Sequence, residues 1–271
     1  MEYQDLTIAN VKPLLDGLIT YKSIIGLSGT HPKHKEKQDL YNRLGLKTLV
    51  EMSIDEAVES GLVAPYKIKV IELSLDNKNK NIAAGSKAKP FMQTEEAKYA
   101  YLTKLINMKL FSGQEVPKFF YLNRMRFLYN LKSKHEFVKK FISKLEGRSL
   151  IFTGSIAQAE DMCKYSYHSG KDDGDLQKFI KGEIPQLSCV NAGGVGYTYR
   201  NVDNLVVAQV NSNGKGDSTQ KIARSLVLQE GYEATIYLFY VARTVDEDWV
   251  KKVLKDFDPD KVEYISGKNY E

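Results

Sequence analysis

The chain has 271 residues, with 39 lysines and arginines against 34 aspartates and glutamates, so its net charge is +5. An apolar content of 42% is enough to fill one large or two modest cores, and the mild basic excess is compatible with nucleic-acid binding without identifying it. Neither cysteine stands in a Cys/His cluster and no apolar run approaches about 18 residues, so we expect no zinc site, no signal peptide and no membrane-spanning helix.

The first third of the chain predicts short elements separated by turns. Ser23–Leu27 is apolar and stops at a polar turn, as a strand does, and residues 33–44 are compatible with a helix. Ser53–Ser60 opens with a Ser-x-x-Glu capping box and predicts a helix. Tyr66–Leu73 alternates apolar and polar residues like a half-exposed strand, and residues 76–89, rich in Asn, Lys and Gly, predict a flexible linker.

The middle of the chain is helical and basic. Thr94–Phe111 predicts one helix, and residues 119–145 predict one broken helix or two consecutive ones. Basic side chains outnumber acidic ones over residues 118–148, and interleaved aromatic residues suit a track for a nucleic-acid backbone. The aromatic residues fall at helical spacing, so a solvated face over a core stripe is the alternative. The candidate phosphate contacts are Arg124, Arg126, Lys132 and Lys134.

Strands and helices alternate from Arg148 onward. This alternation predicts an α/β fold with an open parallel sheet and helices on both faces. The expected strands are Ser149–Phe152, Tyr165–His168, Leu187–Val190, Leu205–Val210 and Ala234–Val241, and the expected helices are Ile156–Lys164, Gly174–Ile180, Thr219–Leu228 and Asp246–Leu254.

The most informative stretch spans residues 189–228. A strand runs into the glycine-rich loop Ala192–Tyr197, and a second strand is followed by a helix start that carries Gln220 and Arg224. Loops of this kind place backbone N–H groups and an arginine beside a polyphosphate or a nucleic-acid backbone.

These segments resemble the motifs of superfamily 2 helicases and translocases, and phage-type DNA helicases in particular. Leu150–Ser155 is similar to motif IV, Asn191–Gly196 to motif V and Gln220–Arg224 to motif VI, in the right order and at fitting spacing. Tyr167–Ser169 looks like the segment after motif IV, and Leu27–Thr30 resembles motif III.

The resemblance implies a domain plan. Residues 148–271 would form the second RecA-like lobe, residues 1–65 a remnant of the first lobe, and residues 66–147 a crossover strand, a linker and a basic helical region. The protein would be cytoplasmic, in the host cell if it is viral, and would act on DNA, as a single strand or a duplex junction, and not on membranes.

The resemblance also implies roles for individual residues. Arg224 would be an arginine finger, with Gln220 one helical turn before it on the same face. The implied nucleotide contacts add Gly193, Gly194 and Gly196; the implied DNA contacts are Thr153, Gly154, Ser155, His168, Ser169 and Asn191; the implied coupling turn is Ser28, Gly29 and Thr30. The structural alternatives are a surface salt bridge for Arg224, an ordinary turn for the glycines, a helix cap for Ser155 and a satisfied core histidine for His168.

Two parts of the helicase pattern are absent from the sequence. No Gly-x-x-x-x-Gly-Lys-Ser/Thr loop occurs, and Asp246-Glu247-Asp248 opens a helix, where the macrodipole favours acids, instead of ending an apolar strand. The motif VI segment has Ala223 and Val227 where the family has glycine and a second arginine. We therefore expect no metal site in the chain itself, and ATP with Mg²⁺ only at an interface with a first helicase lobe, in cis or in trans.

Three functional hypotheses remain open. The first is the C-terminal part of an ATP-dependent DNA helicase or translocase, an ATP hydrolase only when another lobe completes it. The second is a catalytically inactive module that binds nucleic acid or protein. The third is another doubly wound domain, such as a nucleotide-sugar or methyl-donor enzyme, which the missing Gly-x-Gly-x-x-Gly pattern disfavours.

Overall fold

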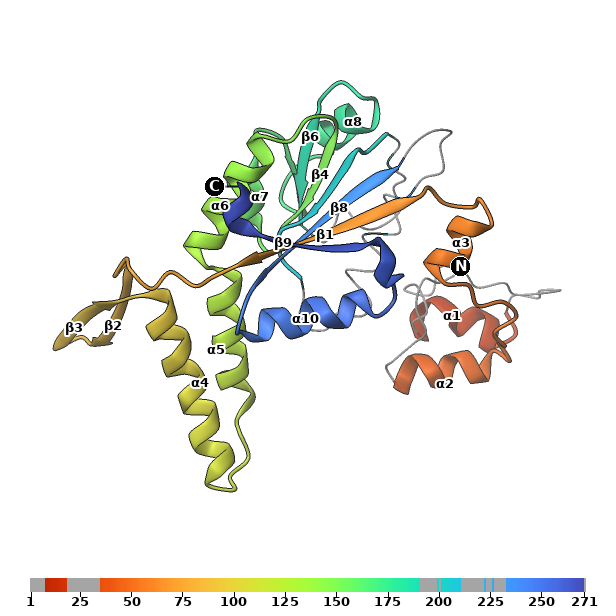
Figure 1. Cartoon of the computed structure of the whole chain (residues 1–271). Coiled ribbons are helices and arrows are strands. Elements are labelled where there is room, and N and C mark those ends of the chain that lie inside the picture. The colour runs from red at the N-terminus through yellow and green to blue at the C-terminus, as the bar shows by residue number, and fades with distance from the viewer. Residues whose placement is uncertain are drawn as a thin grey trace. The chain divides into compact units, whose positions relative to one another are not determined.

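The computed structural model describes residues 8–18, 35–190, 199, 201–210, 222, 226 and 233–270 (Figure 1). The chain forms two compact units, Met1–Ser53 and Ile54–Glu271. The domain boundary expected after Pro65 thus falls inside the second unit. Within the described ranges, no helix is long and apolar enough to cross a membrane.

The first unit contains two short helices, α1 (Ile8–Leu15) and α2 (Lys35–Arg43). Val11 and Leu40 form its small core. Helix α2 confirms the helix expected over residues 33–44, whereas the strand expected at Ser23–Leu27 lies outside the described residues.

A seven-stranded sheet forms the centre of the second unit, and every strand pair in it is parallel. Its order is β5-β6-β4-β7-β8-β1-β9. The central strands are apolar along most of their length, as strands covered on both faces must be. The strands are β1 (Tyr66–Leu73), β4 (Ser149–Phe152), β5 (Ser166–Tyr167), β6 (Gln186–Cys189), β7 (Asn204–Val207), β8 (Ala234–Val241) and β9 (Val262–Ser266).

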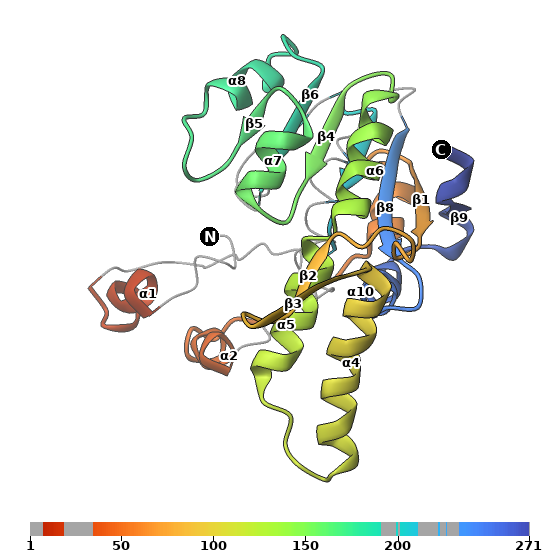
Figure 2. The ribbon, with the colours of Figure 1, turned by 90° about the vertical axis from the view of Figure 1, so that its left-hand side faces the viewer.

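Helices cover both faces of this sheet, which confirms the expected α/β fold. Helices α6 and α7 lie on one side and α10 on the other (Figures 1 and 2). The Phe141 ring of α6 packs edge-on against Tyr237 and Phe239 of β8, with centroids 5.0 and 5.3 Å away. The helices of this unit are α3 (Ile54–Glu59), α4 (Glu95–Phe111), α5 (Lys118–Tyr129), α6 (Lys132–Ser143), α7 (Ile156–Met162), α8 (Gly174–Ile180), α10 (Val245–Leu254) and the 3₁₀ turns η3 (Pro259–Lys261) and η4 (Gly267–Tyr270).

Two elements differ from the sequence expectation. Part of the expected linker forms an antiparallel hairpin of β2 (Ile82–Ser86) and β3 (Lys89–Gln93). Gly85 makes this pairing possible, because its φ is +88° and a Cβ there would collide with the Lys89 carbonyl. Strand β9 was not expected at all; it pairs with β1 and extends the sheet.

Helices α4 and α5 form a hairpin that projects from the sheet, beyond the edge where the strands end (Figures 1 and 2). Thr94 caps α4 by accepting a hydrogen bond from the Ala97 N–H at 3.2 Å. Helix α6 then returns the chain to the sheet, so the region expected to be one broken helix or two is two helices.

Candidate functional site

The sheet has a topological switch point between β4 and β7. After β4 the chain passes through α7 to β5 at one edge, whereas β7 leads to β8 in the opposite direction. In open parallel sheets such a divergence opens a crevice at the carboxyl ends of the two strands, where ligands bind. Thr153 follows β4 and Ala208 follows β7, so the segment similar to motif IV lies at this crevice.

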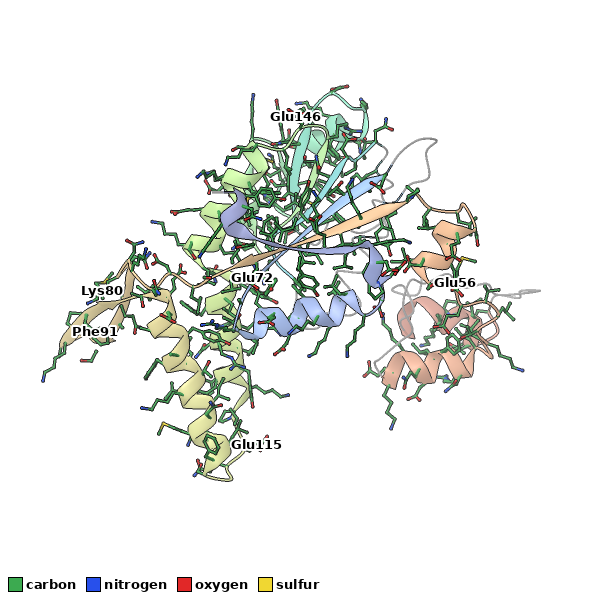
Figure 3. The ribbon with its side chains drawn as sticks, in the orientation of Figure 1. Glu56, Glu72, Lys80, Phe91, Glu115 and Glu146 are labelled. Carbon is green, nitrogen blue, oxygen red and sulfur yellow. The ribbon has the colours of Figure 1, made fainter. Side chains whose placement is uncertain are left out.

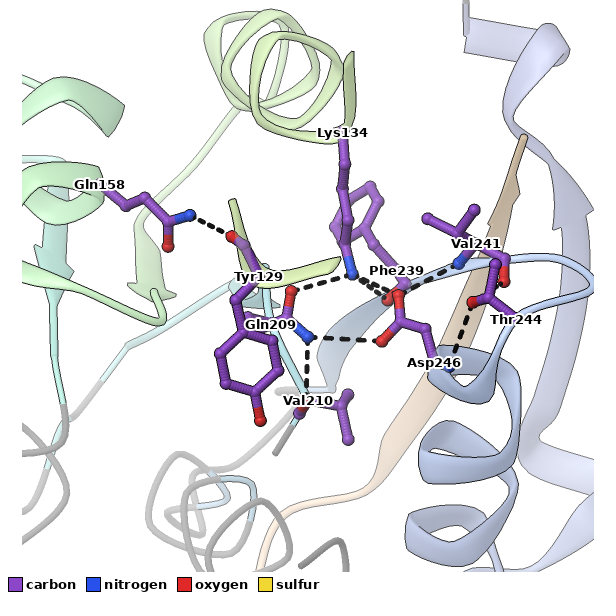
Figure 4. Close-up of polar contacts among 9 residues, drawn as sticks. All are labelled: Tyr129, Lys134, Gln158, Gln209, Val210, Phe239, Val241, Thr244 and Asp246. Carbon is purple, nitrogen blue, oxygen red and sulfur yellow. Dashed lines mark hydrogen bonds and ion pairs between the residues drawn. The ribbon is translucent and has the colours of Figure 1, made fainter. Parts of the chain in front are cut away.

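Two glutamines fill the crevice. The Gly154 N–H donates to Gln158 Oε1 at 3.1 Å, and Gln158 Nε2 donates to the Tyr129 carbonyl at 2.6 Å (Figure 4). A Cβ on Gly154 would lie 3.2 Å from Gln158 Oε1, so a larger residue would crowd this side chain, whereas Gln209 Cγ at 3.4 Å would be in ordinary contact. The described side chains leave a cavity of about 10 Å³, which is room for one water at most.

The hydroxyls at the end of β4 are engaged within the protein. Thr153 is buried, and its Oγ1 lies 3.2 Å from the Ser155 carbonyl oxygen and 3.4 Å from that of Cys189. Ser155 Oγ accepts the Gln158 N–H at 3.3 Å and caps α7. The structure therefore shows the helix-cap alternative for Ser155, and of the segment 153–155 only Gly154 is exposed.

A buried ion pair lies next to the crevice. Lys134 Nζ donates to Asp246 Oδ2 at 2.7 Å, and the two side chains are only 5% and 0% exposed (Figure 4). The other two ammonium donors reach the Phe239 carbonyl at 3.1 Å and Gln209 Oε1 at 3.3 Å. Asp246 in turn accepts the Val241 N–H at 3.1 Å and Gln209 Nε2 at 3.3 Å. Every donor of the ammonium group is thus satisfied, as burial of a charge requires.

This network corrects the expectation for Lys134. A lysine whose charge is paired inside the protein cannot reach a phosphate outside it. The helical spacing of α6 could have indicated that Lys134 is buried. Lys134 shares one helical face with Val138, Phe141 and Ile142, all of which are buried. The pair joins α6 to the ends of β7 and β8 and to the start of α10, and so fixes the point where the chain leaves β7.

The other basic candidates differ in exposure. Arg124 is half-buried, with its guanidinium 6.0 Å from the centre of the Tyr99 ring. Arg126 is exposed, and Lys132 is 72% exposed with Glu136 at 3.6 Å. Only Arg126 and Lys132 of these four candidates therefore keep a charge that faces solvent.

His168 is buried at the end of β5. Its Nδ1 accepts the Gly170 N–H at 3.2 Å, and its Nε2 lies 3.3 Å from Glu160 Oε1 but outside hydrogen-bond geometry. At 5% exposure, His168 offers little surface to a nucleic-acid phosphate, but its Nε2 also lacks the hydrogen bond that a satisfied core histidine would make. Ser169, which comes next, is exposed.

The remaining candidates lie outside the described residues. They are Ser28, Gly29 and Thr30 in the first unit, and Asn191, Gly193, Gly194, Gly196, Gln220 and Arg224 in the second. In chain order, the segment similar to motif V follows β6 and the segment similar to motif VI follows β7.

Metal ions require a set of several ligating side chains. Among the described residues, no group of three His, Cys, Asp or Glu side chains could ligate a metal ion. Asp246, the fully buried carboxylate, already accepts hydrogen bonds on both oxygens. Between the ends of β4 and β7, the described residues leave a cavity of only about 10 Å³, which is too small for a nucleotide.

Comparisons with known proteins identify the fold. No protein-family model and no curated protein match the chain. The structure of S. cerevisiae Dbp5 bound to RNA and ADP BeF3 matches with a TM-score of 0.54 at 11% identity, over 99% of this chain and 59% of that chain. A variant of Dbp5 in the same bound state gives 0.53 at 12% identity over the same shares. This chain thus spans about 59% of the length of these proteins, and it has the RecA-like α/β fold.

Proposed function

We propose that this chain is the C-terminal RecA-like lobe of an ATP-dependent superfamily 2 helicase or translocase. One observation carries the proposal. In a parallel sheet all strands end at the same edge, and the segments similar to motifs IV, V and VI follow β4, β6 and β7, around the switch point. Three separate sequence resemblances therefore follow, in chain order, strands that end at one edge of one sheet.

The proposed lobe supplies part of an ATP site. Arg224 would face the phosphates of ATP held by another lobe, where an arginine finger contributes about 10³–10⁵ in turnover. The other lobe, in cis or in trans, would supply the phosphate loop and the Mg²⁺ ligands that this sequence lacks. The packing of Gln158 and Gln209 beside the ends of β4 and β7 supports this division, because the cavity that the described residues leave there is only about 10 Å³.

We propose DNA as the nucleic acid, on the basis of the resemblance to phage-type DNA helicases. Dbp5, which shares the fold, is described as bound to RNA, so RNA is the alternative that a test must include. The exposed side chains of Arg126 and Lys132 support contact with a backbone of either kind, since phosphate contacts carry no sequence information.

A second candidate function is a catalytically inactive binding module. Val227 stands where the family has its second motif VI arginine, and Ala223 stands where it has glycine. Such a module would keep the fold and the nucleic-acid contacts but would never hydrolyse ATP.

An ATPase assay separates the two candidates. The purified chain would be mixed with a polypeptide that carries the first lobe of a superfamily 2 helicase, and DNA-stimulated ATP hydrolysis would be measured. We expect negligible hydrolysis by the chain alone, stimulation in the mixture, and loss of this stimulation by about 10³ in Arg224→Ala. Arg43→Ala, at an exposed position of α2, is the control.

Each other outcome points elsewhere. DNA binding without any stimulation of ATP hydrolysis would support the inactive module. Vigorous hydrolysis by the pure chain would contradict the proposal that the lobe is incomplete.

A further inference from the structure

A groove runs along α4 at the carboxyl ends of β1 and β8. It encloses about 790 Å³. One wall is a face of α4, whose residues recur at helical spacing from Glu96 through Tyr99, Thr103 and Asn107 to Phe111; the other wall is the chain after β1 and the turn after β8.

The shape of the groove suits a peptide. From Glu96 to Phe111, helix α4 rises by roughly 22 Å at about 1.5 Å per residue. A span of this length accommodates about seven residues of extended chain at roughly 3.3 Å each, or a short helix. Helix-lined grooves are a recurring way to recognise such segments.

The far end of the groove exposes apolar side chains. Phe111 is 90% exposed and Met108 57% exposed, and both line it. Exposed apolar residues gathered in one place mark interaction surfaces, and methionine adapts its shape to varied partners.

The charges in the groove select among possible occupants. Glu72 and Glu96 line it together with Lys104 and Arg243, two acids against two bases. Because the two signs balance, the groove offers no net attraction to the phosphates of a nucleic acid, whereas a peptide that carries both signs could pair with both the acids and the bases. Within the described part of the chain, the side chains of Lys104, Arg243 and Asn107 form no hydrogen bond or ion pair, so they are available to such a partner.

Arg243 has a backbone conformation that side chains rarely adopt. Its φ is +61°, and its N–H donates to Glu247 Oε2 at 3.1 Å. Left-handed backbone at a non-glycine residue is uncommon, and such positions gather at binding sites. Here it places an exposed arginine at the rim of the groove.

We propose that this groove binds a short amphipathic segment of a partner protein. Bulky apolar residues of the segment would pack against Met108 and Phe111, an acidic residue would pair with Lys104 or Arg243, and a basic residue would face Glu72 or Glu96. The proposal is independent of the proposed ATPase function, since none of these residues belongs to the segments similar to helicase motifs.

Peptide selection tests the proposal directly. Twelve-residue peptides would be selected from a displayed library on the full chain, and the enriched sequences would be labelled and titrated by fluorescence anisotropy. We expect bulky apolar residues with one acidic and one basic neighbour, and a loss of affinity of at least about tenfold in Met108→Glu. Phe91→Glu, on the β2–β3 hairpin away from the groove, is the matched control and should bind normally (Figure 3).

A charge reversal sharpens the test. Selection on a variant that carries both Lys104→Glu and Arg243→Glu should replace the acidic residue of the enriched peptides with a basic one. Three results would overturn the proposal: no enrichment on the wild-type chain, enriched peptides that bind Met108→Glu as well as wild type, or a labelled single-stranded oligonucleotide whose binding is lost in Met108→Glu.

Discussion

Helix α6 and the α4–α5 hairpin, which follow one another in the helical middle of the chain, place side chains in opposite environments. Helix α6 buries a lysine, Lys134, together with its counter-ion. The hairpin exposes large apolar side chains, such as that of Phe111, to solvent. The difference shows that position on a helical face, and not the composition of the region, decides which residues are available to partners.

The contrast is sharpest within α6 itself. Lys132 and Lys134 are two positions apart, so they point to nearly opposite sides of the helix. Lys132 faces solvent beside Glu136, whereas Lys134 enters the core and meets Asp246. Burial of this charge is tolerated because each ammonium donor has an acceptor, which offsets part of the desolvation cost.

Removal of Lys134 should have the largest effect. In Lys134→Ala, Asp246 would stay buried without its counter-ion, and we expect the free energy of unfolding to fall by about 3–5 kcal/mol. Urea denaturation monitored by circular dichroism measures it. Lys132→Ala is the matched control and should change stability by less than about 0.5 kcal/mol. Equal effects in the two variants would mean that the buried Lys134–Asp246 pair contributes no more to stability than an exposed lysine.

Removal of a partly buried carboxylate, Asp55, should reduce stability by an amount between those expected for Lys134→Ala and Lys132→Ala. Asp55 accepts hydrogen bonds from Tyr66 Oη and Lys261 Nζ, both at 2.6 Å, and from the Asp258 N–H at 2.9 Å. Burial disfavours the charged carboxylate, but the hydrogen bonds from Lys261 and Tyr66 outweigh it and lower the pKa of Asp55. We expect Asp55→Asn to reduce the free energy of unfolding at pH 7 by about 2 kcal/mol.

The pH dependence of the Asp55 effect follows from the direction of its shift. Because the pKa is lower in the folded state than the unfolded value of about 3.9, the stabilisation is fully present above about pH 4. It is lost as the pH falls through the folded pKa, so the curves of wild type and Asp55→Asn should converge in acid. Glu233→Gln, in the half-exposed pair with Lys67, is the control and should cost less than about 1 kcal/mol. Parallel curves down to the lowest pH would contradict this assignment.

A smaller effect is expected at the crevice. In Gly154→Ala the new methyl group would crowd Gln158, and we expect a loss of about 1 kcal/mol in thermal or urea unfolding. Gly170→Ala is the control, because its nearest neighbour would be His168 Nδ1 at an ordinary 3.4 Å. If both variants unfold like wild type, the packing of Gln158 does not constrain the residue at position 154.

The sequence predicted the regular parts of the fold because they obey a simple period. Strands such as β8 are continuous apolar runs between turns, and the alternation of strand and helix implied a parallel sheet. Strand β9 was not predicted because it is an edge strand with little buried surface, so its alternation of apolar and polar residues is weak. The β2–β3 hairpin was not predicted because its polar, glycine-containing sequence has the composition of a loop.

The site was predicted less completely for a physical reason. Charge and hydroxyl content indicated that Thr153, Ser155 and Lys134 could contact phosphate, but their partners lie far away in the sequence or on the next turn. Lys134 meets Asp246 across 112 positions, and no spacing rule connects the two. The apolar stripe that includes Lys134 was the only local sign that it is buried.

The smallest expected effect concerns the basic residues that stay in solvent. If Arg126 and Lys132 contact a nucleic-acid backbone, each alanine substitution should weaken the binding of a labelled single-stranded oligonucleotide by a few-fold, uniformly across sequences. Each lost phosphate contact means that binding releases fewer counter-ions from the nucleic acid. The slope of log affinity against log salt should therefore become shallower by roughly 0.7 per residue. Lys140→Ala, also exposed on α6 but never a candidate contact, is the control. A change in affinity that leaves the salt slope intact would mean that these residues act on the fold and not on phosphate. Helices α5 and α6 would then have a structural role alone.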